Sequence, residues 1–264
     1  MDLQLEGKRV LVTGSTAGIG LAAAQGLARE GAAVVVNGRT RERVDRAVEE
    51  VRKAAPGAEV SGVAADLGTA EGCARVEEAA PEIDILVNNV GIFEPKPFLE
   101  IPDADWLRFF EVNVMSGVRL SRFYLPGMLE RNWGRIVFVS SESAVQIPAE
   151  MIHYGTTKTA QVAVARGIAE TLAGTGVTAN TVLPGPTRSE GVGTFVAQMA
   201  AASGKDFATM EKEFFETARP TSLLRRFITV EEVANLIVYV CSPAASATNG
   251  AALRVDGGVV RAIL

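Results

Sequence analysis

Residues 13–20 read Thr-Gly-Ser-Thr-Ala-Gly-Ile-Gly; they follow a short apolar run at 9–13 and open a helical pattern at 19–30. Glycines in such a place allow a tight turn and let backbone N–H groups approach a pyrophosphate at the positive end of a helix. The spacing is Gly-x-x-x-Gly-x-Gly, and no Gly-Lys-Ser/Thr of a P-loop follows. The turn predicts a dinucleotide site that includes Gly14, Ser15, Thr16, Gly18, Ile19 and Gly20.

Short apolar runs alternate with longer helical patterns through the rest of the chain. Strands are expected at 9–13, 33–37, 59–64, 83–88, 135–140, 177–182 and 251–255, and helices at 19–30, 41–54, 69–79, 103–131, 151–173 and 230–240. Runs of Val, Ile and Leu with little polar alternation are typical of strands covered on both faces. Strand–helix–strand repetition predicts right-handed crossovers. We therefore expect an α/β fold: a doubly wound, seven-stranded parallel sheet with helices on both faces.

No linker rich in Pro, Gly or Ser divides the chain, so residues 1–264 are expected to form one domain. The segment at about 186–218 breaks the alternation and carries the apolar residues Phe195, Met199, Phe207, Met210, Phe214 and Phe215. It follows the sixth strand, where it could cover the carboxyl ends of the sheet as a substrate lid. A surface helical pair that packs its aromatic residues on the core is an equally good interpretation.

Composition narrows the class of protein. Apolar residues make up 48% and charged residues 22% of 264 residues, which excludes a disordered chain. The net charge is −5 and the basic residues are scattered, so nucleic acid is not an expected partner. One histidine and two distant cysteines indicate reduced thiols and no metal site. No apolar run is long enough for a membrane span and the first strand starts too early for a signal peptide, so we expect a cytoplasmic enzyme or binding protein.

The end of the second expected strand bears on the choice of dinucleotide. An acidic residue there binds the adenosine ribose 2′-OH and repels a 2′-phosphate. This chain has Asn-Gly-Arg-Thr at 37–40, and the fork-shaped guanidinium of Arg39 suits a 2′-phosphate. NADP is therefore favoured over NAD, with a solvated surface cation as the other interpretation of Arg39. Asp66 and Leu67, after the third strand, are placed to meet the adenine.

Tyr154 and Lys158 stand at positions i and i+4 of an expected helix, with Ser141 upstream. Such positions share one helix face, so a phenol and an ammonium point into the same space. A phenol titrates near about 10, and a cation within a few ångströms favours the phenolate and lowers that pKa. The pair predicts an acid/base group tuned toward neutral pH.

Taken together, these motifs resemble the short-chain dehydrogenase/reductase family, a Rossmann-type fold, in its compact single-domain branch with 3-oxoacyl-ACP reductase-like members. The matching marks are 13–20, Asp66, Asn-Asn-Val-Gly at 88–91, Asn113, Ser141, Tyr154, Lys158, Pro-Gly at 184–185 and Val-Asp-Gly-Gly at 255–258. They occur in family order across nearly the whole chain. Two departures are Val90, where the family usually has alanine, and the absence of a basic residue at Thr16 or Ala17, which weakens the NADP preference.

The resemblance implies hydride transfer between a nicotinamide and a carbonyl or secondary alcohol, without a metal. Tyr154 would exchange the proton, Lys158 would hold the nicotinamide ribose, Ser141 would hydrogen-bond the substrate oxygen, and Asn113 would fix a water that links Lys158 to solvent. Ser141 precedes Tyr154 by thirteen residues, which is the spacing of the family. The resemblance therefore favours Ser141 over Ser140 as the serine that contacts the substrate oxygen. Further cofactor contacts are implied for Asn89, Gly91, Pro184, Gly185 and Thr187, and further substrate contacts for Ser143, Val145, Gln146 and Phe93. His153 is expected to pack rather than act as a base.

Two other classes of protein stay open. A dinucleotide-sensing or scaffold protein would keep the fold without the chemistry, but it would not need Ser141, Tyr154 and Lys158. A methyltransferase shares a glycine turn but has no use for the Tyr/Lys pair. The apolar faces of the helices at 103–131 and 151–173, with the family resemblance, predict a homotetramer or homodimer.

Overall fold

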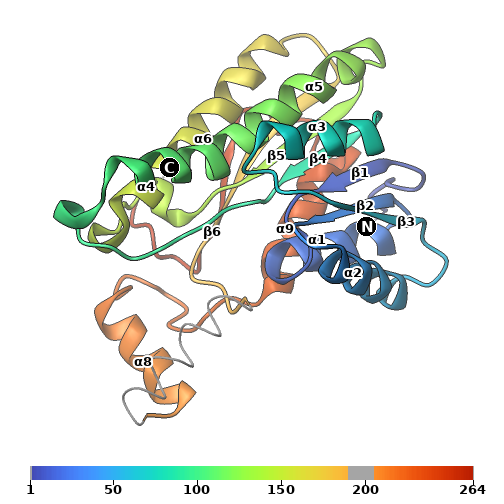
Figure 1. Ribbon diagram of the computed structural model, residues 1–264. Coiled ribbons are helices and arrows are strands. Elements are labelled where there is room, and N and C mark those ends of the chain that lie inside the picture. Colours follow the sequence, from blue (N-terminus) through green and yellow to red (C-terminus); the bar gives the residue numbers. More distant parts are fainter. Residues whose placement is uncertain (1, 190–204, 264) are drawn as a thin grey trace.

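Seven parallel strands form one sheet in the order β3-β2-β1-β4-β5-β6-β7 (Figure 1). The computed structural model describes residues 2–189 and 205–263. The strands are β1 Arg9–Val12, β2 Ala33–Gly38, β3 Val60–Ala64, β4 Ile85–Asn88, β5 Gly134–Val139, β6 Val177–Pro184 and β7 Ala252–Val255. The predicted doubly wound parallel sheet is confirmed, and the strand bounds differ from the prediction by one or two residues at their ends.

Helices cover both faces of the sheet (Figure 1). One layer holds α1 Gly18–Arg29, α2 Arg41–Ala54 and α9 Val230–Cys241; the other holds α3 Ala70–Ala79, α5 Ser116–Glu130 and α6 Ile152–Thr171. Val34, Val87 and Ile237 belong to the first core, and Leu86, Leu120 and Phe138 belong to the second. Because both faces of each central strand are buried, the strands lack the polar alternation of a half-exposed sheet.

Local capping explains where several helices begin. Thr40 accepts a hydrogen bond from the N–H of Arg43 at the start of α2, and Thr69 accepts one from Gly72 at the start of α3. Thr229 and Glu232 form a reciprocal capping box at the start of α9. The start of α1 differs, because Ala17 at its N-cap offers no side-chain acceptor. The first backbone N–H groups of α1 therefore lack a side-chain cap. An anion site at a helix N-terminus requires such uncapped N–H groups.

The predicted helix at 103–131 is continuous but not uniform. It comprises α4 Asp103–Phe110, a π-helical turn at Glu111–Met115, and α5. Asn113 lies in this turn, where one extra residue per turn rotates the side chains relative to a regular helix. Periodicity alone could not show this insertion, because it leaves the apolar spacing of both flanking helices intact.

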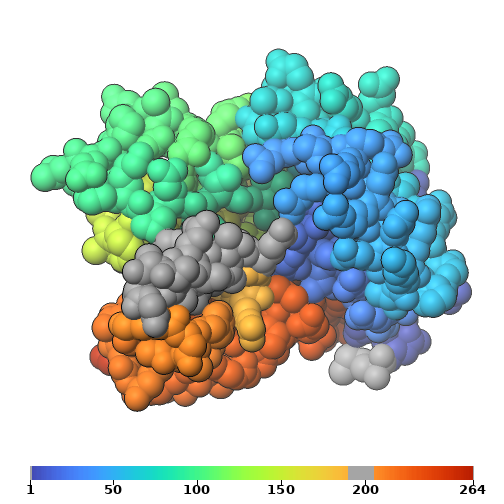
Figure 2. Space-filling model, turned by 60° about the horizontal axis from the view of Figure 1, so that its bottom comes forward, coloured from blue at the N-terminus to red at the C-terminus, as the bar shows by residue number. Residues whose placement is uncertain are grey.

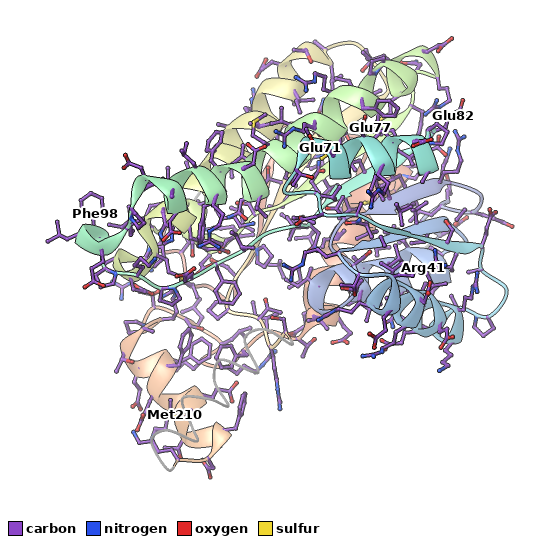
Figure 3. The ribbon with its side chains drawn as sticks, in the orientation of Figure 1. Arg41, Glu71, Glu77, Glu82, Phe98 and Met210 are labelled. Atoms are coloured by element: carbon purple, nitrogen blue, oxygen red, sulfur yellow. The ribbon has the colours of Figure 1, made fainter. Side chains whose placement is uncertain are left out.

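The segment expected to be a lid is described in part. Phe195 and Met199 lie outside the described residues, whereas Phe207–Thr217 form helix α8. Met210, labelled in Figure 3, packs with Phe215 and Phe227 in a small separate core. Figure 1 shows α8 standing away from the sheet, below the ends of β6 and α4. Among the described residues, no helix is long and apolar enough to cross a bilayer.

Candidate active site

The glycine turn after β1 takes the shape that its sequence predicts. Gly14 and Gly18 both have left-handed backbones, with φ of +59° and +58°. A Cβ on Gly20 would lie 2.5 Å from Asn89 Nδ2 and 2.6 Å from the carbonyl oxygen of Gly14, so no side chain fits there. Together with the uncapped N-terminus of α1, the turn leaves room and backbone donors for a pyrophosphate. The residues fit a dinucleotide.

Ser15 holds the turn in place rather than facing a ligand. Its hydroxyl donates to the carbonyl of Val12 over 2.6 Å and accepts the N–H of Asn37 over 3.0 Å. Its own N–H donates to the carbonyl of Asn37. The hydroxyl and the N–H of Ser15 are therefore both bonded within the protein, and a contact between Ser15 and the cofactor stays a prediction. Thr16 packs its methyl group toward Gly38 at the end of β2.

Asn89 and Val90 fasten the end of β4 to the same turn. Asn89 Nδ2 donates to the carbonyl oxygens of Thr13 and Gly14 over 2.9 and 3.0 Å. Val90 packs on the turn: a Cβ on Gly14 would lie 3.0 Å from its Cγ2. The departure from alanine at Val90 is thus accommodated beside the turn without displacing it.

A cavity of about 480 Å³ begins at this turn and continues along the carboxyl ends of the strands. The lining residues near the turn include Ile19, Asn89 and Gly91, and those at the far end include Phe93, Pro95, Met151, Phe214, Ala218 and Phe227. Sheets of this type bind ligands at this edge, where the strand order reverses between β1 and β4. In Figure 2 the α8 segment (orange) and the residues around α4 (green) lie at the same end of the molecule.

Ser141, Tyr154 and Lys158 all line this cavity, as the sequence predicts. Ser141 caps a short 3-10 turn after β5, whereas Tyr154 and Lys158 come from the first turns of α6. Lys158 Nζ lies 5.7 Å from the centre of the Tyr154 ring. It donates to the carbonyl of Val139 and to Oε1 of Gln161, each over 3.1 Å.

Burial shifts the pKa values of both members of the pair. Burial lowers the pKa of Lys158 to about 7, because the charged amine is removed from water. Burial also raises the pKa of Tyr154 above its usual range; the Glu142 carboxylate raises it further, and a hydrogen bond with Ser141 opposes this. In this arrangement burial is the largest cause of both shifts. A lowering of the phenol pKa by Lys158 and the bound cofactor stays a prediction.

Asn113 is fully buried and its side chain is already paired. Its Oδ1 accepts the N–H of Ile92 over 2.7 Å, and its Nδ2 donates to the carbonyl of Ile92 and to Thr157 Oγ1, each over 3.0 Å. Asn113 therefore fixes the loop after β4 against α6. Asn113 Oδ1 accepts one hydrogen bond and retains a lone pair, so the water expected between Asn113 and Lys158 stays a prediction.

The nicotinamide end of the predicted site is formed by the last residue of β6 and the residues that follow it. Pro184, Gly185 and Thr187 line the cavity. Gly185 packs so closely on Asp256 that a Cβ would lie 2.5 Å from its carbonyl oxygen. Thr187 Oγ1 donates to the carbonyl of Gly185 over 2.8 Å, which leaves its lone pairs for a ligand donor.

Arg39, Asp66 and Leu67 lie at the other end of the sheet, outside the cavity lining. Arg39 is exposed directly after β2 and makes no ion pair or hydrogen bond with the residues that the structure describes. Asp66 Oδ1 accepts the N–H of Gly68 over 3.0 Å, and Leu67 is buried in the second core. Figure 3 shows the neighbouring Arg41 on the same side, far from Met210 on α8.

Two of the expected substrate contacts lie outside the cavity lining. Ser143 lines the cavity, but Gln146 and Val145 do not; both are exposed beyond the 3-10 turn. The N–H of Gln146 donates to the carbonyl of Glu142, which continues the turn after Ser141. His153 packs against Phe109 and Trp106 with no hydrogen-bond partner for either ring nitrogen among the described residues, so it is a packing residue as expected.

Sequence reasoning missed three residues of the site. Glu142 and Arg219 line the cavity as a buried ion pair of 3.0 Å, and Gln161 orients Lys158. An acidic residue directly after Ser141 was the one available signal for Glu142. Arg219 is distant in sequence and follows a segment without a motif, so nothing local marked it.

The comparisons with known proteins agree with this geometry. The family model described as short chain dehydrogenase matches residues 8–213. Two uncharacterized oxidoreductases of Bacillus subtilis strain 168, YvrD and YvaG, are 52% and 49% identical over 266 and 263 residues, with all of each chain covered. The crystal structure of L-sorbose reductase from Gluconobacter frateurii, complexed with NADPH and L-sorbose, is 31% identical over the whole of both chains with a TM-score of 0.94. The fold, the order of its motifs and these matches agree on one conclusion: the chain belongs to the short-chain dehydrogenase/reductase family and is a dehydrogenase or reductase.

Proposed function

We propose that this enzyme interconverts a carbonyl compound and a secondary alcohol with NADPH as the favoured cofactor. The observation that carries the proposal is that Ser141, Tyr154 and Lys158 line the same cavity as the glycine-turn residue Ile19. NADPH, when bound, supplies the hydride. Tyr154 donates the proton to the substrate oxygen, Ser141 hydrogen-bonds that oxygen, and Lys158 holds the nicotinamide ribose.

The preference for NADP(H) rests on charge at the end of β2. Arg39 is exposed and unpaired among the described residues, and no carboxylate stands in the segment 37–40. A 2′-phosphate would find a bidentate donor there. The NADPH in the L-sorbose reductase structure supports the same choice.

The far end of the cavity supports a substrate with an apolar portion. Phe93, Met151, Phe214 and Phe227 face the region beyond Ser141 and Tyr154, while Glu142 and Arg219 provide polar contacts near the reacting oxygen. We infer that the substrate is a ketone or secondary alcohol of modest size with one apolar and one polar portion. L-sorbose, the ligand of the similar reductase, and acetoacetyl thioesters are suitable probes at the two extremes of polarity.

The test is turnover of such a panel, followed by NADPH absorbance, for the parent enzyme and Tyr154→Phe. We expect Tyr154→Phe to lose at least roughly a hundredfold in kcat while it still binds NADPH, because only the proton donor is removed. Equal rates for both proteins would refute the role of Tyr154. NADPH binding without turnover of any probe by the parent enzyme would favour the dinucleotide-sensing alternative, and binding of S-adenosylmethionine instead would favour a methyltransferase.

Three further expectations belong to the proposal. Residues 1–264 would form one domain, with the segment at about 186–218 as the substrate lid. A homotetramer or homodimer is supported by Leu107, Phe110 and Phe123 on α4 and α5, which are 71%, 44% and 42% exposed. Sedimentation would test this assembly, and cell fractionation would test a cytoplasmic location.

A further inference from the structure

Glu142 is a buried carboxylate whose two oxygens each receive a hydrogen bond from a neighbour in the cavity. Arg219 Nε donates to Oε1 over 3.0 Å, and Ser141 Oγ donates to Oε2 over 2.5 Å. Only 6% of the Glu142 side chain is exposed. A carboxylate this far from water needs donors on its oxygens, because an unpaired buried charge is costly.

The donor on Glu142 Oε2 is the same hydroxyl that the proposed reaction needs. Ser141 carries one proton, and the N–H of Ser143 donates to its oxygen over 3.1 Å. When a substrate oxygen takes the hydrogen bond from Ser141, the O–H bond rotates away from Glu142 while the proton stays on Oγ. Oε2 of Glu142 then loses its donor, so binding of a substrate leaves this oxygen in need of a new one.

Several other donors of the cavity are engaged elsewhere. Ser140 Oγ and Thr187 Oγ1 each donate to a backbone carbonyl over 2.8 Å. Lys158 Nζ donates to the carbonyl of Val139 and to Gln161 Oε1. A substrate that carries its own donor would satisfy the carboxylate without breaking any of these bonds.

The reacting oxygen and Glu142 Oε2 are both neighbours of Ser141 Oγ. The bond to Oε2 spans 2.5 Å, and one from a hydroxyl to a carbonyl oxygen spans about 2.7 Å, so the two oxygens lie within about 5 Å of each other. A hydroxyl on the carbon next to the carbonyl carbon fits within this gap. It can donate to Oε2 while the carbonyl oxygen accepts from Ser141 and Tyr154.

The local charge favours a neutral hydroxyl over an anionic group. Arg219 pairs with Glu142, and its Nη1 also donates to Glu150 over 3.2 Å. Two carboxylates thus share one guanidinium in this part of the cavity. A substrate carboxylate here would add a third negative charge, whereas a hydroxyl supplies a proton to a site rich in acceptors.

We propose that Glu142 selects substrates with a hydroxyl on the carbon beside the reacting carbon, that is, α-hydroxy ketones and the vicinal diols formed from them. The inference rests on the proposed function, because it depends on Ser141 turning its proton to the substrate oxygen. In the complex the substrate hydroxyl replaces Ser141 as the donor to Oε2. A plain ketone leaves either Glu142 Oε2 or its own carbonyl oxygen without the proton of Ser141, so it is the poorer substrate.

The first test compares three ketones that share one aromatic portion. They are 2-hydroxyacetophenone, propiophenone, in which a methyl group replaces the hydroxyl, and 2-methoxyacetophenone. The methoxy compound keeps the electron-withdrawing oxygen but has no proton to donate, so it separates hydrogen bonding from activation of the carbonyl. With NADPH and the parent enzyme, we expect kcat/KM to be at least roughly tenfold higher for the hydroxy ketone than for either of the others. The pair 1-hydroxy-2-butanone and 3-pentanone repeats the comparison without a ring.

Glu142→Gln tests the same contact from the side of the protein. Its amide oxygen can accept from Arg219 Nε, which turns the amide nitrogen toward Ser141. No charge is then left unpaired by a plain ketone, and the proton of Ser141 is free for its carbonyl oxygen. Turnover of propiophenone should therefore be retained or rise, and the preference for 2-hydroxyacetophenone over propiophenone should fall roughly tenfold.

Glu150→Gln is the matched control for charge. It removes a carboxylate from the same cavity and the same guanidinium, but the bonds among the described residues join Glu150 to Arg219 and not to Ser141. Its preference for the hydroxy ketone should stay within about twofold of the parental ratio. Glu213→Gln, which removes a surface partner of Lys205 on α8, should leave both the ratio and the turnover unchanged.

Two results would overturn the inference while the proposed function stands. One is a parent enzyme that reduces all three aromatic ketones with equal kcat/KM, and the other is a Glu142→Gln enzyme with the parental preference. Either would show that Glu142 does not depend on a donor from the substrate. The comparison of ketones in the parent decides the question alone if Glu142→Gln does not fold.

Failure of the proposed function has a different signature. If the parent turns over none of these ketones, or if Ser141→Ala keeps parental turnover, the role of Ser141 is lost and the inference falls with it. Circular dichroism and NADPH fluorescence show for each variant that the fold and the cofactor site are intact.

Discussion

Gln161 Oε1 accepts a hydrogen bond from Lys158 Nζ over 3.1 Å, while its amide nitrogen donates to the backbone carbonyl of Asn113. The side chain therefore ties the amine of the site to the π-helical turn at Glu111–Met115. Only 1% of Gln161 is exposed, so both bonds lie in a water-poor region where an unpaired group is costly.

Replacing Gln161 with leucine should destabilise the protein and misdirect Lys158. Loss of both bonds leaves the Asn113 carbonyl and one donor of Lys158 unpaired, at a cost of about 1–3 kcal/mol. Urea unfolding gives the stability, and NADPH titration gives the effect on the cofactor site. Gln161→Glu keeps an acceptor for Lys158, so it should retain more NADPH affinity than the leucine variant; the reverse order would contradict the role assigned to this residue.

Gly20→Ala should disrupt the glycine turn, because its Cβ would lie 2.5 Å from Asn89 Nδ2 and 2.6 Å from the Gly14 carbonyl oxygen. The expected result is a lower melting temperature and NADPH binding weakened by at least roughly tenfold. Gly167→Ala is the matched control, since this glycine of α6 has no neighbour within 4 Å. That control should be stabilised by up to about 1 kcal/mol. Similar behaviour of the two variants would show that the turn is not tightly packed.

His153 should make the protein sensitive to acid. Its ring is buried against Phe109, with centroids 4.1 Å apart, and burial lowers its pKa below the usual value. The unfolded chain therefore takes up a proton more readily, so stability falls as the pH drops below about 6.5 and is unaffected above it. Urea unfolding of the parent and His153→Phe at several pH values tests this. The variant should lose part of the pH dependence, and parallel curves would mean that the histidine is protonated without penalty.

Arg39→Asp should shift the cofactor preference from NADP toward NAD. The change removes the donor proposed for the 2′-phosphate and adds repulsion, so the ratio of the two kcat/KM values should fall roughly ten- to hundredfold. Arg41→Asp, at the first residue of α2 and paired with Asp45, is the control for general surface charge. An unchanged ratio in Arg39→Asp would identify Arg39 as a surface cation only.

The sequence located most of the fold because its signals are local. Thr40, Thr69 and Thr229 mark helix starts at their own positions, and the Val/Ile/Leu runs mark strands covered on both faces. The glycine turn is also local, since left-handed backbones at Gly14 and Gly18 need glycine wherever they occur. No pattern in the sequence marked the 3-10 turn after Ser141, beyond which Gln146 is exposed and outside the cavity lining.

By itself, the chain determined a parallel α/β architecture, a dinucleotide turn and a Ser/Tyr/Lys set, because each depends on residue type and short spacing. Only the tertiary structure decided the electrostatics of that set. Burial lowers the pKa of Lys158 to about 7, and the pairing of Glu142 with Arg219 joins residues 77 apart. Desolvation and long-range ion pairs depend on what surrounds a group in space, and no spacing along the chain records that.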